Sequence, residues 1–382
     1  MTILHIFTGL TTFLKLGRDC FESAGIPGEY VVIGRQPTID SSGTTSEIQY
    51  YQLNSDKYYE FLGRLTVKNY SLVLFHSLLL TNATVALDLI KNQPERPPLS
   101  WDLYGAEISM SDIFPHHFHG PLTNRIYYKL APYRIFIPVQ RILQKLFNRS
   151  LHRVFKGMDY IVHFMPEEIK YFEQYSNIKR PSLWFIYSTI EGFVGKDLLD
   201  KKVVKRGNIL IGNSSSFTSN HAEAFELISG ADFQDRKVIV PLSYGNMKYA
   251  GYINEYGKKV LGDNFTPLND FMKLNEYNAL YLTCSCVIMN HYRQQAIGNI
   301  ISAAWLGARI YVNEFTTIYT YFKRIGIHIF SLQRDFQVND SAVFDALSDE
   351  QIAQNRIVLQ REFGSEKVIA DMKISFAEFI EK

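Results

Sequence analysis

The sequence predicts an α/β protein made of two doubly wound, Rossmann-like domains that face a central cleft. Apolar, β-branched stretches alternate with helical stretches in both halves of the chain, as in parallel sheets covered by helices. At 382 residues the chain is too long for one average core. A polar, lysine-rich stretch at residues 191–205 separates the halves. We therefore predict a first domain over residues 1–195, a second over 206–360, and a C-terminal helix, 361–382, that returns to the first domain.

The first half opens with a predicted strand at Ile3–Phe7 and a helix over Thr12–Ala24, which a glycine and a proline end. A threonine at position 81 suits a helix cap, and a proline at position 166 suits a first helical turn. The other predicted elements are strands at Tyr30–Ile33, Ser46–Leu53, Leu72–His76, Met158–Phe164 and Ser182–Tyr187, a strand beginning at Leu99, and helices at Tyr59–Leu65, Thr81–Lys91 and Pro166–Tyr175.

The second half repeats this pattern, and its centre is the stretch Met289–Asn313. Here a strand, a polar turn, an apolar helix and a second strand follow one another, as in a βαβ unit. The predicted strands are Asn208–Ile211, Lys237–Val240, Leu280–Met289, Arg309–Val312 and Ile327–Phe330. The predicted helices are Ala222–Ser229, Met247–Leu261, Ile297–Leu306, Phe315–Ile325, Phe344–Phe363 and Ser365–Glu381.

The composition excludes several classes of protein. Hydrophobic residues make up 46% and charged residues 20% of the chain, a globular balance. The three cysteines, Cys20, Cys284 and Cys286, have no accompanying histidine or cysteine set, so neither a disulfide framework nor a zinc site is expected. No apolar run reaches the roughly 20 residues that span a bilayer, and no signal peptide is evident. We expect a soluble or peripheral protein of a reducing compartment.

Three loops of the second half are rich in amide and hydroxyl side chains and poor in acids: residues 212–221, 243–246 and 291–299. All three lead into predicted helices, whose first N–H groups and dipoles favour bound phosphates. Arg293 adds a fixed positive charge. These loops suit a nucleotide diphosphate. The candidate residues for binding a nucleotide-sugar donor are Asn213, Ser214, Ser215, Asn220, His221, Tyr244, Arg293, Gln295, Gly298 and Asn299.

No Asp-x-Asp pair occurs in the chain, although such carboxylates usually hold Mg²⁺ or Mn²⁺ in metal-dependent nucleotide-sugar enzymes. We therefore expect no metal site and no cofactor. Helix dipoles, amides and Arg293 would then stabilise a departing diphosphate. An ordinary βαβ unit with a polar loop remains the alternative interpretation of this stretch.

In the first half, a predicted strand leads into a glycine and Glu107. Ligands bind at the carboxyl ends of strands in open α/β sheets, so Glu107 is the candidate base for an acceptor hydroxyl. A solvent-exposed loop carboxylate is the alternative. His117, in a run of three nearby histidines, is the second candidate base.

Residues 113–158 contain no aspartate or glutamate, and basic residues recur every four positions opposite an apolar face. Such an amphipathic basic helix is typical of a surface that meets anionic lipid. A nucleic-acid patch and a core-packed helix are the alternatives, and we favour the membrane, with no nucleic-acid partner. The candidate residues for binding the membrane or the acceptor are Arg141, Lys145, Arg149 and Arg153.

Four segments carry a resemblance to a known family: IGNSS-(x)4-NH at 211–221, VPLSYG at 240–245, RQQAIG at 293–298, and W-(x)2-YGAE at 101–107. They resemble the bacterial TDP-N-acetylfucosamine:lipid II N-acetylfucosaminyltransferases (Fuc4NAc transferases, glycosyltransferase family 56). The resemblance covers most of the chain. The last segment departs from the family's Trp-Gly-Ala-Asp run, with tyrosine and glutamate replacing tryptophan and aspartate.

The resemblance implies a GT-B glycosyltransferase at the cytoplasmic face of the bacterial inner membrane. Its donor would be a dTDP- or UDP-linked sugar, and its acceptor an undecaprenyl-diphosphate-linked glycan. Common antigen, O-antigen and capsule synthesis are the candidate pathways. Two alternatives stay open: a soluble sugar-nucleotide epimerase or phosphorylase of the same architecture, and a non-catalytic nucleotide-sugar-binding protein.

Overall fold

The structure is a computed structural model that describes residues 2–8, 12–34, 48–111, 113–114, 118–130, 149–340 and 342–380. The chain divides into two compact units. Unit 1 comprises Met1–Pro115, Pro138–Thr189 and Ser365–Lys382, and unit 2 comprises His116–Ile137 and Ile190–Gly364. This division differs from the predicted one, because a piece of the predicted first domain groups with the second half.

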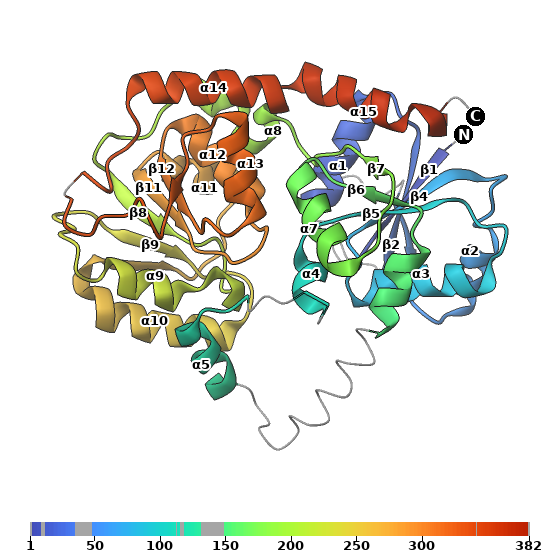
Figure 1. Cartoon of the computed structure of the whole chain (residues 1–382), viewed down its shortest axis with the longest axis horizontal. Coiled ribbons are helices and arrows are strands. Elements are labelled where there is room, and N and C mark those ends of the chain that lie inside the picture. Colours follow the sequence, from blue (N-terminus) through green and yellow to red (C-terminus); the bar gives the residue numbers. More distant parts are fainter. Residues whose placement is uncertain are drawn as a thin grey trace. The chain divides into compact units, whose positions relative to one another are not determined.

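Unit 1 contains a parallel sheet that has 7 strands among the described residues, in the order β3-β2-β1-β4-β5-β6-β7 (Figure 1). The order reverses between β1 and β4, so the crevice at their carboxyl ends is the topological switch point of this sheet. The strands are β1 (Thr2–Phe7), β2 (Gly28–Ile33), β3 (Ile48–Tyr51), β4 (Tyr70–His76), β5 (Leu99–Asp102), β6 (Tyr160–Val162) and β7 (Ser182–Leu183).

Helices cover the sheet of unit 1, and every residue of its central strand β4 is therefore buried. They are α1 (Thr12–Ser23), α2 (Asp56–Gly63), α3 (Leu80–Asn92), α4 (Ala106–Met110), α7 (Pro166–Ser176), α15 (Ser365–Ile380) and the helical residues 149–157. The last helix, α15, packs on α1, β1 and β4. Phe376 meets Phe21 with ring centroids 5.2 Å apart, and Ser375 Oγ accepts a hydrogen bond of 2.6 Å from the Trp184 amide.

Unit 2 contains a second parallel sheet, with 6 strands among the described residues in the order β10-β9-β8-β11-β12-β13. Its switch point lies between β8 and β11. The strands are β8 (Asn208–Ile211), β9 (Val238–Pro241), β10 (Phe265–Leu268), β11 (Cys284–Met289), β12 (Arg309–Val312) and β13 (Phe330–Ser331). The helices are α5 (Pro121–Leu130), α8 (Ile190–Val194), α9 (His221–Ile228), α10 (Met247–Leu261), α11 (Leu274–Tyr281), α12 (Ile297–Leu306), α13 (Thr317–Ile325) and α14 (Asp349–Phe363).

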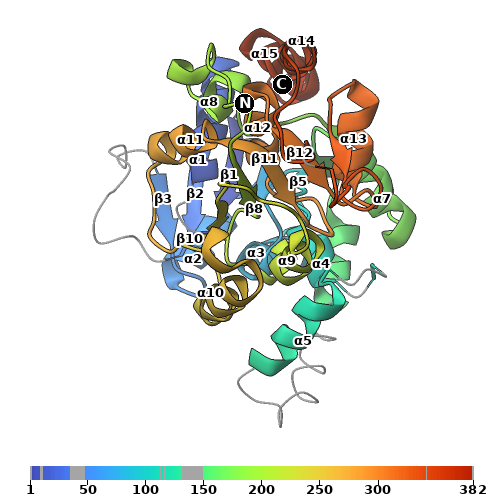
Figure 2. The same cartoon turned by 90° about the vertical axis from the view of Figure 1, so that its left-hand side faces the viewer.

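Helix α5 belongs to unit 2 although it lies in the first half of the sequence. It contacts α9 and α10, as the two views of unit 2 show (Figures 1 and 2). Ile126, only 5% exposed, joins the apolar cluster of the unit 2 sheet, and Leu122 and Leu130 pack against that cluster. Burial of this apolar face explains why α5 stays with unit 2.

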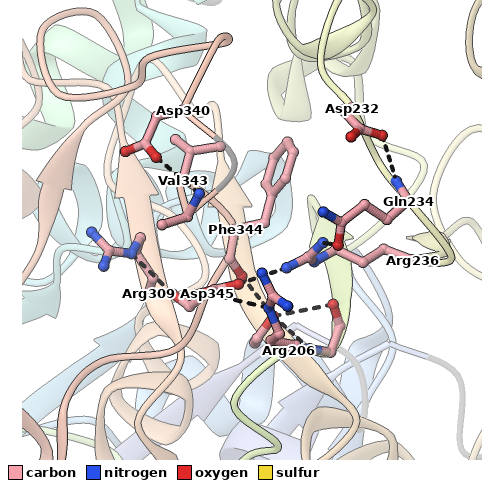
Figure 3. A network of polar contacts seen from close by, with 12 residues as sticks. Arg206, Asp232, Gln234, Arg236, Arg309, Asp340, Val343, Phe344 and Asp345 are labelled. Carbon is pink, nitrogen blue, oxygen red and sulfur yellow. Dashed lines mark hydrogen bonds and ion pairs between the residues drawn. The ribbon is translucent and has the colours of Figure 1, made fainter.

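At the amino-terminal ends of the unit 2 strands, three arginines surround Asp345 (Figure 3). Arg236, whose side chain is 3% exposed, pairs with the Asp345 carboxylate at 2.6 Å, and Arg206 lies 3.7 Å from it. Arg309 Nε donates to the Asp345 carbonyl at 2.9 Å. A buried pair of this kind fixes geometry, because losing either partner leaves a charge without compensation. This network fixes the sheet at the edge opposite the candidate loops.

Candidate active site

The loops after β8 and β11 meet at the switch point of unit 2, where ligands bind in doubly wound sheets. The first runs through the small polar residues 212–220, and the second through residues 290–296. The loop after β9 joins them, since Ser215 forms an isolated parallel bridge with Gly245. Ser215 Oγ also donates to the Tyr244 carbonyl at 2.7 Å. Loops that the sequence places far apart are therefore brought together here.

A chain of side-chain hydrogen bonds connects these three loops. Gln295 Nε2 donates to Asn213 Oδ1 at 3.0 Å, and Asn213 Nδ2 donates to the Tyr244 hydroxyl at 3.2 Å. Thr218 Oγ1 donates to Gln295 Oε1 at 2.7 Å. Tyr244 is 52% exposed, so the chain ends at a solvent-facing ring. Three of the predicted residues thus form one network whose outer end is accessible.

Two helices of unit 2 begin at this switch point without a side-chain cap. Helix α12 follows Ala296, which has a positive φ of 61° and makes no side-chain cap bond. Gly298 and Asn299 lie half-buried in the first turn of α12. Helix α9 likewise starts without a side-chain cap. Uncapped first turns offer N–H donors and a positive dipole end to an anion.

Arg293 lies in the loop before α12, half-buried, and its Nη1 donates to the Gln294 carbonyl at 2.7 Å. This bond holds the guanidinium close to the backbone of its own loop. A guanidinium can bind phosphate oxygens in a fork. Arg293 therefore lies in the predicted loop, beside the start of α12.

Asn220 has a structural role that the sequence does not show. It is fully buried, and its Oδ1 accepts a bond of 2.8 Å from the Gly120 amide. Its Nδ2 donates to the carbonyls of Phe118 and Asn290, each at 3.1 Å. With the Thr218 carbonyl, four backbone groups occupy this amide, which has little left for a ligand. Asn220 joins the loops after β8 and β11 to the segment that leads into α5, which differs from the predicted donor contact.

The other small or ring residues of the predicted donor set, Ser214, Ser215 and His221, are also buried, with exposures of 4%, 0% and 0%. Ser214 accepts a bond from the Ser219 hydroxyl through its carbonyl oxygen. Ser215 holds the loop after β9, as described above. Burial gives these two serines a role in shaping the loop, where the sequence predicted direct contact with the donor.

Glu223 of α9 caps α5 from outside that helix. Its carboxylate accepts hydrogen bonds from the Thr123 amide at 2.8 Å and the Thr123 hydroxyl at 2.5 Å. A carboxylate at a helix N-terminus satisfies unpaired N–H groups and complements the dipole. Gly120 makes room for it, since a Cβ there would lie 2.3 Å from Glu223 Oε1. Sequence reasoning missed this contact, because nothing local to α5 indicates it.

Three buried polar side chains cluster around the same switch point: His221, His291 and Gln294, with exposures of 0%, 2% and 9%. Burial lowers the pKa of both histidines to about 3, and the nearby Arg293 and His221 contribute to the low pKa of His291. Both imidazoles are therefore neutral at physiological pH.

In unit 1, Glu107 follows β5 at the carboxyl end of that strand, in the first turn of α4. Its side chain is 0% exposed, and Oε1 accepts a hydrogen bond of 2.8 Å from the Leu78 amide in the loop after β4. Burial, the Glu107 charge and a bond to Tyr104 act on Asp102, and the net effect raises the pKa of Asp102 well above its usual range. Glu107 thus holds the loop after β4, which includes Ser77 at a φ of 79°. His117 lies outside the described residues.

The basic segment is described only in part, because Arg141 and Lys145 lie outside the described residues. Arg149 and Arg153 are exposed on the helical residues 149–157. The opposite face is core, since Leu151, Val154 and Phe155 are at most 1% exposed. This apolar face packs inside unit 1, as in the core-packed alternative, and the basic face stays exposed.

Within the described residues, no helix combines the length and apolar character that crossing a bilayer requires. The same residues include no group of three or more histidine, cysteine or acidic side chains arranged to hold a metal ion.

Comparisons with known proteins agree with this geometry. The family described as 4-alpha-L-fucosyltransferase glycosyl transferase group 56 matches residues 124–315, half of the chain. Anabaena HepE, solved in complex with UDP and glucose, matches with a TM-score of 0.63 and 9% identity over 99% of both chains. A Rickettsia africae glycosyltransferase matches with a TM-score of 0.61 and 10% identity over 100% of this chain and 99% of that one. Thermosynechococcus elongatus sucrose-phosphate synthase matches with a TM-score of 0.58 and 11% identity over 99% and 98%.

The solved neighbours confirm the predicted GT-B fold, with its two Rossmann-like domains. The matched region begins in α5, spans the β8, β9 and β11 loops and ends just beyond β12, so it includes the whole candidate site of unit 2. The chain belongs to the glycosyl transferase group 56 family and is a glycosyltransferase.

Proposed function

We propose that the enzyme transfers a deoxy-amino sugar such as Fuc4NAc from a dTDP- or UDP-sugar to an undecaprenyl-diphosphate-linked glycan. The pathway would be the synthesis of a bacterial surface polysaccharide: common antigen, O-antigen or capsule. The observation that carries this proposal is the meeting of two uncapped helix starts, Arg293 and the Gln295–Asn213–Tyr244 chain at one switch point. That HepE was solved with UDP and glucose supports a nucleotide-sugar donor for a chain of this fold.

In the proposed reaction the acceptor hydroxyl oxygen attacks the anomeric carbon of the donor. The bond from that carbon to the diphosphate oxygen breaks, and its electron pair leaves with the nucleoside diphosphate. The first-turn amides of α12 and the Arg293 guanidinium would stabilise the growing charge, without a metal ion. One of the two candidate bases, Glu107 or His117, takes the hydroxyl proton. Tyr244, exposed at the end of the hydrogen-bond chain, would contact the nucleoside.

We place the acceptor on unit 1, at the carboxyl end of β5, where Glu107 lies in the first turn of α4. His117, further along the chain, is the second candidate base. The exposed Arg149 and Arg153, together with Arg141 and Lys145, would bring anionic lipid or the acceptor's diphosphate to this unit. The enzyme would then work as a peripheral protein at the cytoplasmic face of the inner membrane.

Replacement of Arg293 tests the donor site. We expect Arg293→Ala to raise the Kd for UDP or dTDP by about 10- to 100-fold, because a charge-assisted bond to phosphate is lost. Arg293→Lys should recover part of the affinity, since it keeps the charge and loses the fork. The binding is measured by calorimetry across a panel of nucleoside diphosphates, followed by turnover with a prenyl-diphosphate glycan. Equal affinity in all three proteins would remove Arg293 from the site.

A further inference from the structure

The described residues give no hydrogen-bond partner to several buried polar atoms at the unit 2 switch point. These atoms are both ring nitrogens of His291, Nε2 of His221 and Oε1 of Gln294. Folded proteins pair nearly all such atoms, because a buried donor or acceptor without a partner costs folding free energy. A ligand bound at the switch point would supply partners to several of them at once.

The position of the two rings is fixed by the strands that precede them. His291 is the second residue after β11, and His221 is the first residue of α9. The His221 ring lies against Gly212, the first residue after β8, where an added Cβ would be 2.6 Å from Nε2. The unpartnered Nε2 therefore points to the end of β8. Both rings lie at the β8–β11 crevice, together with the uncapped starts of α9 and α12.

The surroundings of His291 favour an anion. After burial, the Arg293 guanidinium and the His221 ring are the groups that lower the pKa of His291. The Tyr249 hydroxyl lies 3.3 Å from His221 Nδ1. The acid in this region, Glu223, uses both of its oxygens on Thr123. A buried neutral imidazole there has one N–H to donate and no carboxylate partner among these groups.

We propose that His291 binds the diphosphate of the donor, giving its ring N–H to a phosphate oxygen. This inference rests on the proposed function, and it adds a residue that the loop pattern alone did not indicate. Because the imidazole is held neutral until an anion arrives, binding of the diphosphate also favours its protonation. The bound state would then carry a positive imidazolium beside the leaving group, where charge develops as the sugar departs.

The test compares His291→Leu with His291→Asn in the full-length protein. Leucine removes the unpartnered ring nitrogens, so we expect an unchanged or higher Tm without ligand and a Kd for UDP or dTDP raised by about 10- to 100-fold. Asparagine keeps an N–H donor and should recover part of this affinity. The loss should be larger for the nucleoside diphosphate than for the monophosphate. Wild-type protein should also take up protons on binding near pH 6, seen by calorimetry in two buffers, and the leucine variant should take up fewer.

A purely structural histidine would give the opposite pattern, with a lower Tm in both variants and an unchanged Kd, and that result would overturn the proposal. If His291→Leu does not fold, His291→Asn alone decides. A His291→Asn variant with the wild-type Kd for nucleoside diphosphates and the wild-type proton uptake on binding would overturn the proposal equally. Arg293→Ala separates this inference from the proposed function. Weaker binding in Arg293→Ala with normal binding in His291→Leu contradicts the role of His291 only. No binding of any nucleoside diphosphate to the wild type contradicts the proposed function itself.

Discussion

At the scale of single residues, burial separates the side chains that build the site from those that can meet a ligand. Asn213, Tyr244 and Gln295 are partly or largely exposed, whereas Asn220 and Glu107 are fully buried and bonded to backbone groups. The sequence gives the residue types of a polar loop. It does not tell which amides turn inward, because their partners come from loops distant in the chain.

The burial of Glu107 leads to a prediction about the base. Glu107→Gln keeps an oxygen for the Leu78 amide, so we expect turnover within about threefold of wild type if Glu107 only holds the loop. Glu107→Ala leaves that amide unpaired and should lower the free energy of unfolding by about 1–3 kcal/mol. His117→Ala should lower kcat by about 10²- to 10⁴-fold, as loss of a general base does. Steady-state kinetics of the three variants measures these effects. A large loss of kcat in Glu107→Gln with near-normal kcat in His117→Ala would assign the role of base to Glu107.

At the scale of elements, most strands and helices follow from the alternation of apolar and polar stretches. The predicted strand Arg309–Val312 and helix Met247–Leu261 match β12 and α10 in both bounds. The helix predicted from Phe344 begins later, at Asp349, because Ser348 caps it with a bond to the Gln351 amide. Placing α5 on unit 2 could not be predicted, since Glu223 and Asn220 lie about 100 residues further along the chain.

The outside cap of α5 can be tested with a matched pair of glycine substitutions. Gly120→Ala places a Cβ against the Glu223 carboxylate, so the cap moves and α5 should lose about 1–2 kcal/mol of local stability. Gly251→Ala, within α10 and with nothing within 4 Å of its Cβ position, should stabilise its helix by up to about 1 kcal/mol. Tryptic cleavage at Arg125 and Lys129 reports the opening of α5. Equal cleavage rates in wild type and Gly120→Ala would show that the carboxylate does not hold this helix.

At the scale of the whole molecule, both units bury neutral histidines. His5 and His163 in unit 1 and His221 and His291 in unit 2 have pKa values lowered by burial to about 3. Each ring remains neutral when folded but takes a proton below about pH 6.5 when unfolded. The unfolded state then binds more protons, so these groups lower the stability as the pH falls from 6.5. Asp102, whose pKa is raised, acts in the opposite direction.

Four histidines outweigh one aspartate, so we expect stability to fall between pH 6.5 and 5, by up to about 1.4 kcal/mol per pH unit for each histidine. Urea unfolding at several pH values measures the slope. His291→Leu provides the control. Without this histidine, the free energy of unfolding of unit 2 should depend less steeply on pH, by the contribution of one histidine. A flat profile over this range in the wild type would mean that the rings accept protons in the folded state.

The docking of α5 on unit 2 and of α15 on unit 1 affects how the protein can be divided. The chain leaves unit 1 after residue 115, returns at 138, leaves again at 190 and ends in unit 1 from 365 onward. A cut in the lysine-rich stretch would therefore separate α5 from the cluster that buries Ile126, and α15 from the sheet that it covers. Neither fragment would carry its complete core, so the two halves of the chain are not independent folding units.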